Sequence, residues 1–263
     1  MGILNVTPDS FSDGGMFDSV APALEHARQM IEEGADILDI GGESTRPGSV
    51  RVSVGEEIAR VVPVIKAVTE NLDIPLSIDT SKSEVAEAAV EAGAEIVNDI
   101  SGLRFDEEIA SVASRHRAGL ILMHSRGDFE TIHSQPPVED ILNEVSVDFE
   151  RSVAVANRAG VASEQIVLDV GIGFGKTPEQ NLELIAKLDK LVSEFERFPI
   201  LVGTSRKSFI GKLLGDASPN ERLAGSIATV AVAIWNGAMI VRVHDVKETV
   251  QTVRIVEALR SAN

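Results

Sequence analysis

Two residue types are missing from this chain of 263 residues, and each absence removes a kind of chemistry. The sequence has no cysteine, which excludes disulfides, thiolate nucleophiles, cysteine-ligated zinc and iron–sulfur clusters. It also has no tyrosine, so no phenol side chain can serve as a catalytic acid or base. Acid–base chemistry in this chain therefore has to come from other side chains.

Long hydrophobic runs and an excess of positive charge are missing too. No apolar run approaches the roughly 20 residues that a transmembrane helix needs, and the first residues lack the basic and apolar regions of a signal peptide. The formal net charge is −17, a balance that repels nucleic acid and anionic membranes. We therefore expect a cytoplasmic protein that acts on small molecules, without nucleic acid or a membrane as a partner.

The chain does contain a repeating pattern. Eight times, a short apolar run ends in polar residues and is followed by a stretch of helical periodicity. Eight strand–helix units predict an α/β fold, a closed (β/α)8 TIM barrel, as one domain over residues 1–263. After a first strand at the very start, strands are expected near residues 36–40, 75–79, 95–98, 119–123, 166–169, 200–203 and 239–243. Because no residues precede the first strand, a segment that closes the amino-terminal face is expected to be absent.

The polar residues at the ends of these runs are the candidates for a functional site, because barrels carry their active sites at the carboxyl ends of the strands. Asp79 and Asp169 each end an apolar run. Asp79 could instead cap the helix predicted at 82–92, whereas glycines follow Asp169, which could accept hydrogen bonds from a heterocycle. Asn98 could read the edge of a flat ring or, with Asp99, simply form a turn.

A glycine-rich segment over residues 171–177 resembles two phosphate-binding motifs without matching either. Gly175-Lys176-Thr177 is the end of a Walker A motif, but Val170 occupies the position of its first glycine. A dinucleotide fingerprint fails because Lys176 stands where the third glycine belongs. The segment therefore predicts a flexible backbone beside Asp169, with Lys176 nearby.

Basic residues follow several predicted strand ends, which would let an acidic protein bind an anionic substrate locally. The loops after strands seven and eight often bind phosphate in barrels, and alternation places Arg242 and His244 on the same side of strand eight. Arg206 and Lys207 could alternatively start an exposed helix, and Arg242 could form a surface ion pair. His26, His116 and His133 are interpreted as structural or exposed, and no histidine pattern predicts a structural zinc site.

These segments, in this order, resemble the signatures of the dihydropteroate synthase family. The opening signature is Asn5-Val6-Thr7-Pro8-Asp9-Ser10-Phe11-Ser12-Asp13-Gly14-Gly15, and the second is Gly41-Gly42-Glu43-Ser44-Thr45-Arg46-Pro47-Gly48. Further matches are Ser77–Thr80, Asn98–Gly102, Gly171–Lys176, Ser205–Gly211 and Arg242–Asp245. The resemblance covers essentially the whole chain.

The resemblance implies an enzyme of folate biosynthesis and the target of sulfonamides. Such a transferase joins 6-hydroxymethyl-7,8-dihydropterin diphosphate to 4-aminobenzoate, releases pyrophosphate and uses Mg2+. The family is thought to lose pyrophosphate before the amine attacks, which needs no covalent enzyme intermediate. A homodimer is expected on the same ground.

The resemblance also implies roles for individual residues. The pterin would be bound by Asp79, Asn98, Met123, Asp169, Lys207 and Arg242. The diphosphate would be bound by Asn5, Thr45, Arg46, Arg242 and His244, with Asn5 also meeting Mg2+. The aminobenzoate would be bordered by Phe11, Pro47, Phe174, Lys176 and Ser208. Catalysis would depend on Asp79, Asp169, Lys207, Arg242 and Asp13.

Two alternative functions remain open at this point, and the sequence departs from the family in two places. A methyltetrahydrofolate-binding barrel of the corrinoid methyltransferase type shares the pterin-edge Asp and Asn, but has no use for a diphosphate clamp. A non-catalytic pterin-binding barrel is the other alternative. Val170 replaces a proline usual in the family, and the loop 125–137 differs from the family pattern. Either departure could alter loop rigidity.

Overall fold

The computed structural model describes residues 1–7, 20–45 and 48–262. Eight parallel strands follow one another around a single sheet in the order β1 to β8. A parallel bridge between Gly2 and Val243 joins the last strand to the first, and the Ile3 N–H donates to the Val243 oxygen over 2.9 Å. The sheet is thus closed, and the predicted (β/α)8 barrel is confirmed.

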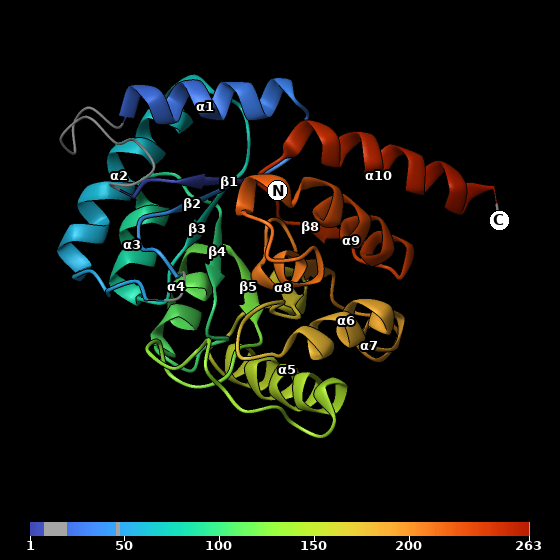
Figure 1. The fold of residues 1–263 in the computed structure, drawn as a ribbon. Coiled ribbons are helices and arrows are strands. Elements are labelled where there is room, and N and C mark those ends of the chain that lie inside the picture. The colour runs from blue at the N-terminus through green and yellow to red at the C-terminus, as the bar shows by residue number, and fades with distance from the viewer. Residues whose placement is uncertain (8–19, 46–47, 263) are drawn as a thin grey trace.

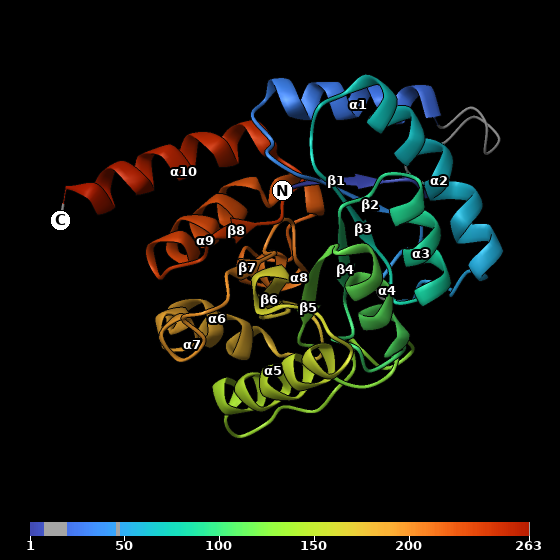
Figure 2. The same cartoon turned by 180° about the vertical axis from the view of Figure 1, so that it is seen from behind.

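The helices cover the outside of the barrel, and the last one reaches away from it (Figure 1 and Figure 2). The strands are β1 (Gly2–Asn5), β2 (Leu38–Gly41), β3 (Leu76–Asp79), β4 (Ile96–Asp99), β5 (Gly119–Met123), β6 (Ile166–Asp169), β7 (Ile200–Val202) and β8 (Ile240–Val241). The helices are α1 (Val20–Glu32), α2 (Val54–Asn71), α3 (Ser83–Glu91), α4 (Glu108–His116), α5 (Ile141–Arg158), α6 (Pro178–Ala186), α7 (Leu188–Glu194), α8 (Ser208–Leu213), α9 (Leu223–Trp235) and α10 (Val246–Ser261).

Alternation along the strands separates two environments. One set of strand residues packs outward against the helices in the main hydrophobic core, for example Leu38, Ile40 and Ile78. The residues between them point into the barrel, because successive side chains of a strand face opposite sides. In β2 and β3 this inner set includes Asp39 and Asp79, so the barrel interior is polar at this end.

The strand register brings the predicted site residues to one edge of the sheet. Asn5 pairs with Gly41, Gly41 with Asp79, and Asp79 with Asn98. Farther along the sheet, Met123 of β5 pairs with Asp169 of β6. Residues that are far apart in sequence therefore form a row at the carboxyl ends of neighbouring strands.

The helical periodicity of residues 178–194 predicts one continuous helix, and this prediction is wrong. The stretch 178–194 is two helices, α6 and α7, because Lys187 between them leaves the helical region with φ −114° and ψ 24°. The apolar periodicity continues across the break, with Leu184 buried on one side and Leu188 and Leu191 on the other. The sequence pattern therefore could not show where the backbone changes direction.

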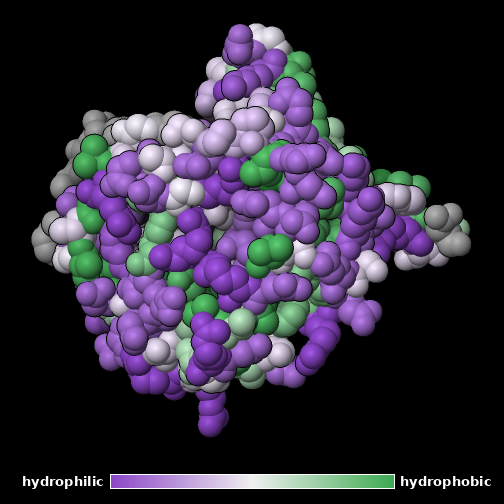
Figure 3. Space-filling view, turned by 90° about the horizontal axis from the view of Figure 1, so that it is seen from below, coloured by the Kyte–Doolittle hydropathy of each residue, from purple (hydrophilic) through white to green (hydrophobic). Residues whose placement is uncertain are grey.

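The described surface is predominantly hydrophilic on the face shown in Figure 3, where apolar residues form only small patches. Such small exposed apolar patches are ordinary for a globular protein. Within the described ranges, no helix combines the length and apolar character that crossing a membrane requires.

Candidate active site

A cavity of about 570 Å³ opens where the carboxyl ends of the strands meet. The predicted residues that line it are Asn5, Thr45, Asp79, Asn98, Met123, Asp169, Phe174, Lys207, Ser208, Arg242 and His244. A separate hollow of about 990 Å³ between α5 and the α6–α7 pair contains none of them. The predicted Phe11, Asp13, Arg46 and Pro47 lie outside the described residues.

Arg242 holds two carboxylates from neighbouring strands. Its Nε donates to Asp39 Oδ2 over 2.5 Å, and its Nη2 donates to Asp79 Oδ2 over 2.7 Å. Asn98 Nδ2 donates to the same Asp39 oxygen over 3.1 Å. We call these four residues, from β2, β3, β4 and the end of β8, the Arg242 cluster.

Burial shapes the charges of the Arg242 cluster. Burial would lower the pKa of Arg242, but the carboxylates of Asp39 and Asp79 raise it above its ordinary value, so the guanidinium stays charged. Burial raises the pKa of Asp79 to about 7, although Arg242 opposes the shift. Within the described structure, Asp39 Oδ1 and Asn98 Oδ1 are buried without a hydrogen-bond partner. Because such atoms are costly to leave unpaired, they favour a ligand that offers N–H groups.

Asp169 lies across the cavity from this cluster, at the end of β6. Its Oδ1 accepts a hydrogen bond from the Gly171 N–H over 2.8 Å, and burial raises its pKa above the ordinary value. The ammonium of Lys207 lies 4.1 Å from the centre of the Phe174 ring, and burial lowers the pKa of Lys207 to about 8. A flat, polar ring would meet both hydrogen-bonding groups and a cation here.

The third part of the cavity wall comes from the loops after β7 and β8. His244 Nδ1 lies 3.1 Å from Ser205 Oγ, which also accepts from the His244 backbone N–H. Burial, followed by the charge of Arg242, lowers the pKa of His244 to about 3, so this imidazole is neutral near pH 7. Arg206 pairs with Asp245, which reduces the positive charge that Arg206 can offer a ligand.

Comparison with known proteins agrees with this geometry. The profile of the pterin binding enzyme family matches residues 1–244. The dihydropteroate synthase of Synechocystis is 51% identical over 98% of this chain and 89% of its own length. The chain belongs to the dihydropteroate synthase family.

Two solved structures of that family have the same fold. The Yersinia pestis enzyme in complex with a sulfonamide drug superimposes with a TM-score of 0.92 at 44% identity, covering 99% of this chain and 94% of its own. The Xanthomonas albilineans enzyme in complex with 7,8-dihydropteroate gives a TM-score of 0.88 at 40% identity, covering 99% and 93%.

The first departure from the family pattern, Val170, fits the core of this family member. Its side chain is fully buried in the main hydrophobic cluster. The next residue is Gly171 with φ +64°, where a Cβ atom would lie 1.8 Å from the backbone oxygen of His124. A glycine is therefore required to turn the chain after Asp169, whichever residue precedes it.

Lys176 lies behind the cavity wall rather than on it. Its ammonium donates to the backbone oxygens of Gly171, Phe174 and His124, over 2.8, 3.1 and 3.3 Å. Burial lowers its pKa to about 7. These bonds hold the loop after β6, and the predicted contact of Lys176 with aminobenzoate stays a prediction.

The second departure, the loop 125–137, reaches the cavity through His133. His133 Nε2 lies 2.6 Å from the backbone oxygen of Thr45, and its Nδ1 lies 3.3 Å from that of Gly173. His133 also lines the cavity, although it was interpreted from the sequence as a structural or exposed residue. The atypical loop thus connects the loops after β2 and β6.

Two alternatives raised by the sequence are resolved by the contacts. Asp79 does not cap a helix, since the residue before α3 is Lys82 and the first N–H of α3, that of Ser83, donates to Asp106 Oδ2 over 2.7 Å. Asn98 faces the cavity, whereas Asp99 makes the turn by accepting from the backbones of Ser101 and Leu103. Asp39, near the end of the second apolar run, is a further charged residue of the cluster to which the sequence pattern assigned no role. The sequence feature that could have indicated a role for it is a carboxylate between two apolar residues of one strand.

Proposed function

We propose that this chain condenses 6-hydroxymethyl-7,8-dihydropterin diphosphate with 4-aminobenzoate to give 7,8-dihydropteroate and pyrophosphate. In this reaction the amine nitrogen forms a bond to the pterin methylene carbon, the carbon–oxygen bond to diphosphate breaks, and the nitrogen loses a proton. One observation carries the proposal. A single cavity is lined by carboxylate and amide acceptors together with basic residues.

The pterin would lie between the Arg242 cluster and Asp169. The unpaired oxygens of Asp39 and Asn98, with the carboxylates of Asp79 and Asp169, match the N–H groups on the edge of a pterin. Lys207 would donate to its carbonyl side. A folded site with these acceptors already in place loses little entropy when the ring binds.

The diphosphate would lie toward His244 and Arg242. Because the Ser205 hydroxyl accepts from a backbone N–H, its own hydrogen can go to His244 Nδ1, which leaves the Nε2 hydrogen free to donate. Arg242 would stabilise negative charge as the carbon–oxygen bond breaks. A methyl-transferring barrel would need no such groups, so the arrangement favours condensation over the methyltransferase alternative.

The residues present fit the expected Mg2+. This ion prefers oxygen ligands and commonly relies on one or two protein groups together with substrate phosphates. Asn5 offers one such oxygen at the cavity wall, and the described residues contain no cluster of three or more His, Asp or Glu that would form a complete protein cage. When bound, Mg2+ would neutralise charge on the departing diphosphate.

The aminobenzoate would bind at the outer part of the cavity, near Phe174 and Ser208. The Yersinia pestis relative was solved with a sulfonamide, a class of compound that imitates aminobenzoate. A sulfonamide should therefore compete with aminobenzoate and not with the pterin diphosphate. Steady-state inhibition with each substrate varied measures this, and competition against the pterin diphosphate would refute the assignment.

We also propose that the enzyme is a cytoplasmic homodimer. Trp235 at the end of α9 and Met239 after it are exposed, as are Ile255 and Leu259 of α10. Exposed apolar residues on adjoining elements are typical of an interface. A Trp235→Glu variant should shift the molecular mass measured by light scattering toward that of the monomer.

The direct test of the proposed function is pyrophosphate release. Release should require both substrates and Mg2+, and the organic product should have the mass of 7,8-dihydropteroate. Pterin binding without pyrophosphate release would favour the non-catalytic barrel, and a lack of pterin binding would refute the assignment altogether.

A further inference from the structure

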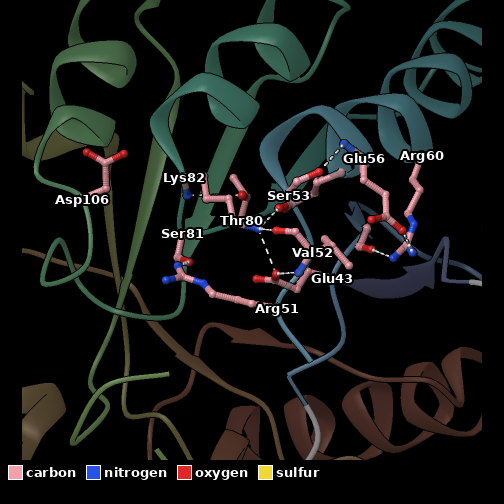
Figure 4. Close-up of polar contacts among 12 residues, drawn as sticks. Glu43, Arg51, Val52, Ser53, Glu56, Arg60, Thr80, Ser81, Lys82 and Asp106 are labelled. Atoms are coloured by element: carbon pink, nitrogen blue, oxygen red, sulfur yellow. Dashed lines mark hydrogen bonds and ion pairs between the residues drawn. The ribbon is translucent and has the colours of Figure 1, made fainter. Parts of the chain in front are cut away.

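A second buried cation lies beside the active site without lining it. Lys82 precedes α3, and its ammonium donates to Glu57 Oε2 over 2.5 Å, to Glu43 Oε1 over 2.8 Å and to the Val52 oxygen over 2.9 Å (Figure 4). Lys82 and Glu57 are buried. We call Lys82, Glu43, Glu57 and Val52 the Lys82 cluster.

The Lys82 cluster joins the two ends of the loop between β2 and α2. Glu43 lies just after β2 and Val52 just before α2, and the Val52 N–H donates to the same Glu43 oxygen over 2.7 Å. One ammonium thus holds the place where the chain leaves the barrel and the place where it returns (Figure 4). The residues between these points include Ser44 and Thr45, which line the cavity together with Glu43.

Further contacts hold the end of the loop that lies just before α2. Arg51 Nη2 donates to Ser81 Oγ over 3.2 Å. Its guanidinium also lies 5.1 Å from the ring centre of Phe129 and 5.6 Å from that of Phe105. The base of the loop is therefore attached to the loops after β3, β4 and β5.

Stability alone does not account for this cluster. Removing charges from water is costly, and a buried ion pair often contributes no more than well-packed apolar residues would. Glu57 shows the cost, because burial raises its pKa even though Lys82 opposes the shift. Its Oε1 is also buried without a partner within the described structure. The remaining advantage of such buried ion pairs is that they fix the positions of the chain segments that they join.

We propose that Lys82 is a positioning residue that fixes the two ends of the β2–α2 loop, and through Ser44 and Thr45 the diphosphate and aminobenzoate side of the site, without touching a substrate. This inference rests on the proposed condensation activity. The Lys82 cluster supplies none of the strand-end side chains Asp79, Asn98 and Asp169, although Glu43 lines the same cavity and the charge of Glu57 contributes to the raised pKa of Asp79.

The test compares Lys82→Met, which keeps a long unbranched side chain without the charge, with Lys187→Met. Lys187 pairs with Glu183 on the exposed surface of α6 and serves as the matched control. Lys82→Met should raise the KM for aminobenzoate about tenfold, because a loop released at its base no longer holds the binding residues in place. Its affinity for 6-hydroxymethyl-7,8-dihydropterin, measured by calorimetry, should match that of wild type. Lys82→Arg should bring the KM for aminobenzoate part of the way back to the wild-type value.

A measurement that does not use activity keeps this inference separate from the proposed function. Hydrogen exchange at the Val52 amide should be faster in Lys82→Met than in Lys187→Met, because the Glu43 carboxylate that accepts from this amide loses its anchor. If unpaired Glu43 and Glu57 prevent folding, the double variant Lys82→Met with Glu57→Gln removes one of the two charges.

Two results would overturn the inference. A folded Lys82→Met enzyme with wild-type KM for aminobenzoate and unchanged Val52 exchange would show that the loop needs no such anchor. Equal losses of pterin affinity and aminobenzoate binding would show a general structural role. Inactive wild-type protein would refute the proposed function alone, since the exchange measurement still tests the anchor.

Discussion

Two cations of this molecule are each held by two carboxylates, and they differ in what else can reach them. Arg242 and Asp79 line the cavity, and Arg242 also holds Asp39, which is fully buried and has a carboxylate oxygen without a partner in the described structure. Lys82 contacts Glu43 and Glu57 behind a loop, and it does not line the cavity. We propose that the same kind of pairing serves substrate recognition in one place and the positioning of a loop in the other.

The two clusters also differ in the elements that carry them. The Arg242 cluster comes from strands β2, β3 and β4 and the end of β8, whose register fixes the side chains by backbone hydrogen bonds. The Lys82 cluster connects loops and helix starts. Groups on strands need little further support to be held in place, whereas a loop that carries binding residues has to be anchored.

Arg242→Ala should give the largest effect of any single change. It removes the cation that faces the diphosphate and leaves Asp39 and Asp79 close together without a counter-charge. We expect kcat/KM to fall about a thousandfold, the scale seen when a group that stabilises developing charge is removed. Steady-state kinetics measures this, with Arg254→Ala on the exposed face of α10 as the control. Activity near that of the control would contradict the role.

The raised pKa of Asp79 predicts a pH dependence of stability. Because the folded-state pKa is about 7 and the unfolded value is about 4, the folded state holds an extra proton between these values. Stability from this group is therefore present below about pH 4 and is lost as the pH rises to about 7. Relative to Asp79→Asn, the wild type should lose a few kcal/mol of unfolding free energy across this window. Urea denaturation at several pH values measures the difference, and a pH-independent difference would refute the shift.

Asp169→Ala should weaken pterin binding while leaving the barrel folded. Loss of a charged acceptor costs about 1.5–3 kcal/mol, so affinity should fall at least about tenfold. Calorimetry of 6-hydroxymethyl-7,8-dihydropterin binding measures this, with circular dichroism as the folding check and exposed Asp73→Ala as the control. A folded variant with wild-type affinity would remove Asp169 from the pterin site.

His244→Ala should have the smallest and most selective effect. A neutral imidazole contributes an ordinary hydrogen bond, worth about 0.5–1.5 kcal/mol. The variant should therefore bind the pterin diphosphate about two- to tenfold more weakly and bind the pterin without diphosphate as wild type does. Parallel titrations with both ligands separate these effects. Equal losses for the two ligands would place His244 at the pterin instead.

The sequence predicted most of the strand-end residues proposed to bind the pterin and little of the Lys82 cluster and the loop contacts. Asp79, Asn98 and Asp169 were found because each ends an apolar run, and parallel strand ends must meet at one edge. Asp39 stands near the end of its run, but no role was predicted for it, because only alternation reveals that it faces inward.

Loop contacts could not be predicted in the same way. His133 reaches Thr45 across 88 positions, and Lys176 turns to three backbone oxygens instead of the cavity. Such contacts depend on how separate loops fold over the barrel mouth, and no local periodicity encodes them. The break at Lys187 was missed for a related reason, since buried residues on both sides continue one helical pattern.

The most direct test of the division between the two clusters is one calorimetric titration, repeated on three proteins. The ligand is 6-hydroxymethyl-7,8-dihydropterin without diphosphate, and the proteins are wild type, Asp79→Ala and Lys82→Met. We predict that Asp79→Ala loses binding by about tenfold or more, whereas Lys82→Met binds as wild type does. Equal losses in both variants, or full binding by Asp79→Ala, would contradict the division between an Arg242 cluster that binds the pterin and a Lys82 cluster that positions a loop.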